Sequence, residues 1–289
     1  MLKLFTDTDC DVTPEIAAEY GYGLISMPYA IDGKTVYPYE DFDTFDARAF
    51  YDLLRDGALP NTSAISREKY IEVFEPVFRA GDDILYVHFS RAMTATFDAM
   101  DQAVAELKAR YPERKFYDID TKGITIVSLN IAREVGDMAL AGTPVEAILE
   151  WAKTEVDKFA IYFFADDLKF FKHSGRVSGL AATMGTLLGV RPIIHMNSEG
   201  KMVSIGSERG RARAINRLMQ YVEELGEDVK GHRVIVGHTD APEIAGEVAA
   251  RLKERYGDDL RLETVAVNPT TGGHCGPDGV GVCFHAIHR

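Results

Sequence analysis

Short apolar runs alternate with helix-forming segments along almost the whole 289-residue chain, and this alternation limits the possible folds more than any other feature. Leu2–Phe5, Ile84–Phe89 and Phe159–Ala165 have the length and apolar character of buried strands. Helical segments separate these strands, and strands connected in this way pair in parallel through β-α-β crossovers. The sequence therefore predicts an α/β fold.

Several helices have clear start signals. Thr13 followed by Pro14 is typical of an N-cap and the first helical residue. Thr143, Pro144 and Glu146 form a similar pattern, so we expect a helix capped by Thr143. The run "LISMPYAI" predicts one further strand, followed by a hairpin turn at "DGK".

The pattern changes after about Asp166. The run "LAATMGTLLGV" predicts a helix of small apolar residues, and "NSEG" predicts a hairpin turn between the strands "RPIIHM" and "KMVSIG". Hairpins among helices indicate a mixed sheet. We therefore expect two α/β domains: residues 1–157 with a mainly parallel sheet and flanking helices, and residues 158–289 with a mixed sheet and helices.

Composition excludes several classes of function. Lys and Arg number 32 against 45 Asp and Glu, and the net charge of −13 disfavours wholesale binding to nucleic acid or to anionic lipid surfaces. Three cysteines without a C-x-x-C pair argue against a disulfide framework. No apolar run has the length of a membrane span. We expect a soluble, cytoplasmic protein with no nucleic-acid partner and no integral membrane association.

Common nucleotide and metal motifs are absent or incomplete. Gly33-Lys34-Thr35 ends like a phosphate-binding P-loop, but Pro28 stands where the first glycine is needed. There is no G-x-S-x-G and no H-E-x-x-H. His274 and Cys275 lack partners at the spacing of a zinc site, so no metal is expected.

Asp9 and Asp11 support an alternative hypothesis. The segment Asp9–Thr13 spells D-x-D-x-T, which resembles the aspartyl nucleophile motif of haloacid-dehalogenase-type phosphatases. Asp9 would attack phosphorus and Asp11 would handle the proton in a metal-dependent phosphatase or phosphotransferase. The motif begins two residues beyond the expected strand end at Asp7, and a later G-D-x-x-x-D is missing.

Three loops that carry hydroxyl or imidazole groups follow predicted strands. They are Pro60–Ser66, Phe89–Thr96 and the glycine-rich loop around His274. Ligands of parallel α/β sheets gather at the carboxyl ends of strands. Thr62, Thr94 and His274 could therefore hold an anionic oxygen without a metal.

Five ordered segments, spread over essentially the whole chain, resemble motifs of the DegV family. This family includes the fatty-acid-binding subunits of bacterial fatty-acid kinase. The segments are "TDTDCDVT", Thr62–Ser66, Ser90–Phe97, "DDLKFFKHSGRVSG" and "GGHCGPDGVGV".

The resemblance implies a non-catalytic carrier that binds a long-chain fatty acid in an apolar tunnel between its two domains. A separate ATP-dependent kinase subunit would then phosphorylate the carboxylate, and no cofactor beyond the bound fatty acid is implied. The resemblance places Thr62 and Thr94 as donors to the carboxylate, with His274 completing the pocket. The other ligand-site positions that it implies are Ser63, Ser90, Gly273 and Arg176.

The acyl chain would supply most of the affinity. Each buried CH₂ contributes up to roughly 0.8 kcal/mol, so a chain of about fourteen methylenes supplies about 11 kcal/mol before entropy costs. Thr94, Cys275 and Asp278 depart from the family pattern, which leaves open a different small amphiphile as the ligand.

A basic segment is the expected docking surface for the kinase. Arg209, Arg213 and Arg217 recur at four-residue spacing and would share one face of a helix over Arg209–Leu225. Arg176 and Arg209 are expected near the kinase-facing surface, on the family resemblance. We predict that Arg209 and Arg213 dock the partner.

Overall fold

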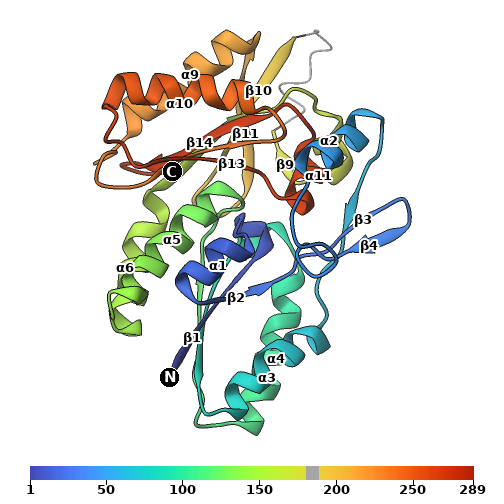
Figure 1. The fold of residues 1–289 in the computed structure, drawn as a ribbon, viewed down its shortest axis with the longest axis vertical. Helices are drawn as coiled ribbons and strands as arrows, with labels where there is room; N and C mark the ends of the chain where they lie inside the picture. The colour runs from blue at the N-terminus through green and yellow to red at the C-terminus, as the bar shows by residue number, and fades with distance from the viewer. Residues whose placement is uncertain (180–188) are drawn as a thin grey trace.

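The computed structural model describes residues 1–179 and 189–289, and its first half is built on a parallel sheet (Figure 1). All pairings in this four-stranded sheet are parallel, as predicted. In spatial order the strands are β2 (Tyr22–Ile25), β1 (Leu2–Asp7), β6 (Asp83–His88) and β7 (Phe116–Asp120).

The helices of the first half begin close to their predicted caps. Thr13 accepts a hydrogen bond from the backbone N–H of Ile16 and caps α1, and Ser66 caps α3 in the same way. Thr143 does not cap α6. Pro144 is the last extended residue before that helix, so Thr143 lies one residue too early to reach its free N–H groups. The helices are α1 (Pro14–Tyr20), α2 (Ala47–Arg55), α3 (Arg67–Arg79), α4 (Thr96–Arg110), α5 (Ile126–Leu140) and α6 (Val145–Glu155), with 3₁₀ turns η1 (Thr8–Cys10), η2 (Arg91–Met93) and η3 (Val156–Lys158).

The predicted strand "LISMPYAI" is two strands in different sheets. β2 ends at Ile25, and β3 begins at Tyr29, because Pro28 has no N–H for a sheet ladder. The Ser26 hydroxyl donates to the carbonyl of Pro38 at 2.7 Å and holds the bend. The second strand joins a small antiparallel sheet that contains the predicted hairpin: β4 (Lys34–Val36), β3 (Tyr29–Ile31) and β5 (Asn61–Thr62).

The second half contains a seven-stranded mixed sheet, as predicted. β8 is antiparallel to both of its neighbours, so the parallel pairing predicted for this strand is wrong. The helix before β8 carries the chain from one sheet to the other, and no crossover within one sheet is formed. In spatial order the strands are β13 (Leu262–Ala266), β12 (Val234–His238), β14 (Val280–His285), β8 (Phe159–Phe164), β10 (Val190–Met196), β11 (Met202–Arg209) and β9 (Val177–Ser178).

Two long helices cover one face of the second sheet, at the top of Figure 1. These are α9 (Arg211–Leu225) and α10 (Pro242–Tyr256), and their buried residues Leu218 and Val248 pack in one core with Phe284 of β14. The described part of the second half also contains two short helices, α7 (Lys169–Ser174) and α11 (Pro269–Cys275). A helix is predicted for the run "LAATMGTLLGV". Its residues 180–188 lie outside the described residues. No helix within residues 1–179 and 189–289 is both long enough and apolar enough to cross a membrane.

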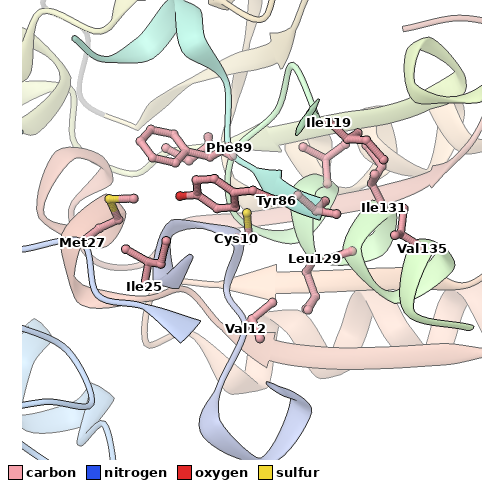
Figure 2. Close-up of a cluster of buried hydrophobic side chains, with 14 of the residues drawn as sticks. Cys10, Val12, Ile25, Met27, Tyr86, Phe89, Ile119, Leu129, Ile131 and Val135 are labelled. Atoms are coloured by element: carbon pink, nitrogen blue, oxygen red, sulfur yellow. The ribbon is translucent and has the colours of Figure 1, made fainter. Parts of the chain in front are cut away.

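Helix α5 lies between the two sheets. It contacts β6 of the first sheet and β8, β12 and β14 of the second. Figure 2 shows Leu129 of α5 in one cluster with Cys10 of η1 and Tyr86 of β6. The same core includes Ile161 and Cys283 of the second sheet. One apolar core is therefore shared by both halves, and a domain boundary at residue 157 stays a prediction.

Candidate ligand-binding site

The three predicted loops surround one cavity of about 210 Å³. Thr62 and Ser63 reach it from β5 and the residues that follow, and Thr94 comes from the segment before α4. His274 comes from α11, and Arg176 from the turn between α7 and β9. Five of the predicted ligand-site residues thus line one space, although they are far apart in the chain.

His274 and Thr62 form a direct pair in this cavity. The imidazole Nε2 lies 3.0 Å from the Thr62 hydroxyl, and the other ring nitrogen, Nδ1, is buried with no hydrogen-bond partner among the described residues. Burial, with smaller contributions from the positive charges of Arg176 and His173, lowers the pKa of His274 to about 4. The ring is therefore neutral near pH 7 and carries one N–H that can donate to a ligand.

The glycine-rich segment that carries His274 is a helix and not the predicted loop. The Asn268 side chain accepts a hydrogen bond from the backbone N–H of Thr271 at 2.9 Å and caps α11, with Pro269 as the first helical residue. A Cβ at Gly272 would lie 2.1 Å from the Tyr51 hydroxyl, and one at Gly273 would lie 3.1 Å from the side chain of Pro60. These glycines allow α11 to pack closely against α2 and the segment before β5.

Ser90 and Gly273 lie beside the cavity; neither is among the described residues that line it. The Ser90 hydroxyl donates to the carbonyl of Gly200 at 2.7 Å and accepts from the backbone N–H of Ala92. Ser90 thus joins the loop after β6 to the turn between β10 and β11. Its position indicates that it supports the site by holding the two halves together.

The basic segment is not a single helix face. Arg209 ends strand β11, and Gly210, with φ of +83°, separates it from α9, which begins at Arg211. The predicted helix start at Arg209 is therefore wrong. Arg209 and Arg213 are exposed, whereas Arg217 pairs with Glu208 at 2.9 Å.

Asp9 and Asp11 hold structural elements together. Asp11 Oδ1 accepts from the backbone and side-chain N–H groups of Asn268, at 2.9 and 2.7 Å. Asp9 Oδ1 accepts from the Thr271 hydroxyl at 3.3 Å. Within the described residues there is no group of three or more His, Cys, Asp or Glu side chains suited to a metal ion. The two carboxyl groups therefore anchor α11, and Asp9 also lines the cavity of Thr62 and His274, whereas Asp11 does not. The phosphatase hypothesis lacks a metal site among the described residues.

Replacing Asp9 by Asn should make stability less dependent on pH. Burial, with a smaller contribution from the charge of Asp7, raises the pKa of Asp9 well above its usual range. The folded state then binds this proton more tightly than the unfolded chain, so the resulting stability is present below about pH 4 and is lost as the pH rises through the folded pKa. Urea unfolding at about pH 5 and pH 8 should show a smaller fall in unfolding free energy for Asp9→Asn than for the wild type. Equal falls would contradict the assignment.

An apolar cavity of about 50 Å³ adjoins the polar one. Phe163, Phe171 and Met196 contribute to its walls, together with Cys275, the residue after His274. Ile124 and Met202 line both cavities. The polar groups around His274 therefore lie at one end of an apolar interior.

The family model of uncharacterised proteins of the DegV family matches residues 1–286. The chain belongs to the DegV family. A DegV domain-containing protein of Clostridium perfringens is 26% identical over 286 residues, which cover 97% of this chain and 96% of that protein. A DegV domain-containing protein of Caldanaerobacter subterraneus is 26% identical over 283 residues, which cover 98% of each chain.

Solved DegV-type structures share the fold. A stearic acid-binding protein of Eubacterium ventriosum superposes with a TM-score of 0.87 at 22% identity, over 99% of this chain and 98% of that one. A DegV family protein of Thermus thermophilus, described by its fatty acid binding, superposes with a TM-score of 0.85 at 19% identity, over 99% of each chain. The fold is therefore that of fatty-acid-binding DegV proteins.

Two features near α11 have no clear signal in the sequence. Thr270 lines the polar cavity, and its hydroxyl donates to the carbonyl of Met27 at 2.7 Å.

Asp278 has φ of +65°, a conformation that favours glycine. Its carboxylate lies 2.9 Å from the guanidinium of Arg55, which also binds Asp240. This ion-pair network ties α2 to the segment after α11.

Proposed function

We propose that this protein binds a long-chain fatty acid, with its carboxylate in the cavity of Thr62, Thr94 and His274. The observation that carries the proposal is the neutral His274–Thr62 pair at the end of an apolar interior. A buried carboxylate needs several donors to replace its lost hydration. The two hydroxyl groups and one imidazole N–H can supply them without a metal.

The first methylene groups of the acyl chain would occupy the apolar cavity that adjoins the head-group cavity. Aromatic and aliphatic side chains form most of its walls, which suits a ligand that contributes only CH₂ groups. Ile124 and Met202 line both cavities, so these two side chains lie where the head-group cavity and the apolar cavity meet. Long-chain fatty acids meet both requirements, with a charged head and a long apolar body.

Native mass spectrometry of protein purified without added lipid tests the ligand. We expect a mass excess of one fatty acid per chain, and extraction should identify it as a long-chain carboxylic acid. A stoichiometric amphiphile with another head group would replace the proposal with a different ligand. Protein that is empty and takes up no added fatty acid would refute lipid binding altogether.

We further propose that the protein is a carrier and not a catalyst, and that a separate ATP-dependent kinase forms the acyl phosphate. Arg209 and Arg213 are exposed near the end of β11 and the start of α9, where they could contact such a partner.

The test uses a kinase that forms acyl phosphate from the fatty acid bound to the wild-type protein. The double variant Arg209→Glu and Arg213→Glu should reduce acyl-phosphate formation and leave the bound lipid unchanged. Arg255→Glu, at an exposed position on α10, is the control. Unchanged turnover in the double variant would exclude this docking surface.

A further inference from the structure

A second polar cavity, of about 270 Å³, shares no lining residue with the two cavities described above. Three carboxyl groups line it, from Asp11, Glu15 and Asp43. No Lys, Arg or His is among the described residues of its lining. The cavity is therefore strongly acidic, which favours a cationic ligand.

Asp11 lines this cavity and has one carboxyl oxygen without a hydrogen-bond partner among the described residues. Only 6% of the residue is exposed, and its Oδ1 takes both hydrogen bonds from Asn268. The other oxygen, Oδ2, is buried and has no hydrogen-bond partner among the described residues. A buried acceptor without a donor costs about 1–3 kcal/mol. A ligand that brings an N–H donor to this oxygen would remove that cost.

Aromatic side chains form another part of the wall. Tyr39 and Phe45 line the cavity, and Phe42 packs against both rings, with centroid distances of 5.6 and 6.3 Å. Tyr39 also has φ of +61°, which is rare for a bulky residue. Rings of this kind attract organic cations through their π faces.

We propose that this cavity binds a small organic ammonium ion of the aliphatic diamine class. One ammonium group donates to Oδ2 of Asp11, and the second lies near the exposed carboxylates of Glu15 and Asp43. The methylene chain lies against Tyr39 and Phe45. Inorganic cations fit less well, because the described residues contain no group of three metal-ligating side chains.

The cavity is linked to α11 through Asp11. Burial raises the pKa of the Asp11 carboxyl to about 7. A cation beside it favours the ionised form and so strengthens its two hydrogen bonds to Asn268, the cap of α11. Ligand binding should therefore stabilise the folded protein, since it favours the native state alone. This effect does not depend on whether a fatty acid is bound.

Titration with 1,4-diaminobutane tests the proposal. Isothermal calorimetry at low salt should show saturable binding, and the thermal unfolding midpoint should rise with ligand concentration. Asp43→Asn should weaken binding about tenfold, the effect of one lost charge-assisted contact of about 1.4 kcal/mol. Asp32→Asn is the matched control, because Asp32 is an exposed acid on the nearby hairpin and does not line the cavity. Asp11→Asn should abolish binding.

Three outcomes would overturn the proposal. The first is the absence of both binding heat and a shift in the unfolding midpoint. The second is an equal response to 1,4-butanediol, which has the same length without charge, or to NaCl at the same ionic strength. The third is equal weakening in Asp43→Asn and Asp32→Asn. Because Asp43 is exposed and has no hydrogen-bond or ion-pair partner among the described residues, its variant remains informative even if Asp11→Asn fails to fold.

Discussion

A protein with Thr62→Val and His274→Ala should lose about 10²–10⁴-fold of its affinity for a long-chain fatty acid. Each substitution removes one donor to the buried carboxylate, and hydrogen bonds to charged groups contribute about 1.5–3 kcal/mol each. The two side chains lie 3.0 Å apart, so they act on one head group. Equilibrium binding of a labelled fatty acid, together with the lipid content of the purified variant, measures the effect.

Two conservative variants control this experiment. Thr62→Ser keeps the hydroxyl group and should bind within a few-fold of the wild type. Ser90→Ala removes a hydroxyl that donates to the carbonyl of Gly200, outside the cavity. It should lower stability more than it lowers intrinsic affinity. Retention of fatty acid by the double variant at the wild-type level would remove Thr62 and His274 from the binding site.

Gly276→Ala should destabilise the protein by about 2–6 kcal/mol. Gly276 has φ of +74° and ψ of 173°, a region that is essentially restricted to glycine, and a side chain there costs about 1–3 kcal/mol. The added Cβ would also lie 2.1 Å from Cδ2 of Phe170, a ring that is 1% exposed. Overpacking of this kind costs a further 1–3 kcal/mol, roughly. Urea unfolding monitored by circular dichroism gives the free energy of unfolding.

Gly142→Ala separates the two causes. Gly142 has a similar φ of +77°, but no heavy atom lies within 4 Å of the position its Cβ would take. Its substitution should cost only the backbone strain. Equal losses at Gly276 and Gly142 would show that the contact with Phe170 has no energetic weight. A larger loss at Gly276 would confirm that α11 packs tightly against α7.

Local patterns in the sequence predicted most elements of the fold, because strand length and helix capping depend on neighbouring residues. Thr13 and Ser66 cap helices where expected. The α11 helix was missed, although Asn268 followed by Pro269 is a normal helix start. A run of glycines favours a loop with unusual backbone angles, but Gly272 and Gly273 serve close packing and have no positive φ.

Long-range relations were harder to predict. The approach of Thr62 to His274, 212 residues along the chain, is predicted by the convergence of loops at strand ends and by the resemblance to the DegV family, and by no local pattern. The antiparallel pairing of β8 depends on strands from distant parts of the chain. The ion pair between Arg55 and Asp278 spans 223 residues. No pattern within one segment contains this information, so the structure was needed to find it.

The position of α5 has a consequence for how the chain acquires its structure. Leu129 and Val135 are fully buried in a core that also contains Ile161 and Cys283, which are synthesised later. A nascent chain that ends near residue 157 would therefore expose one side of α5 to water. We expect such a fragment to aggregate or to bind chaperones. Folding to completion must wait until β14, the last strand, leaves the ribosome.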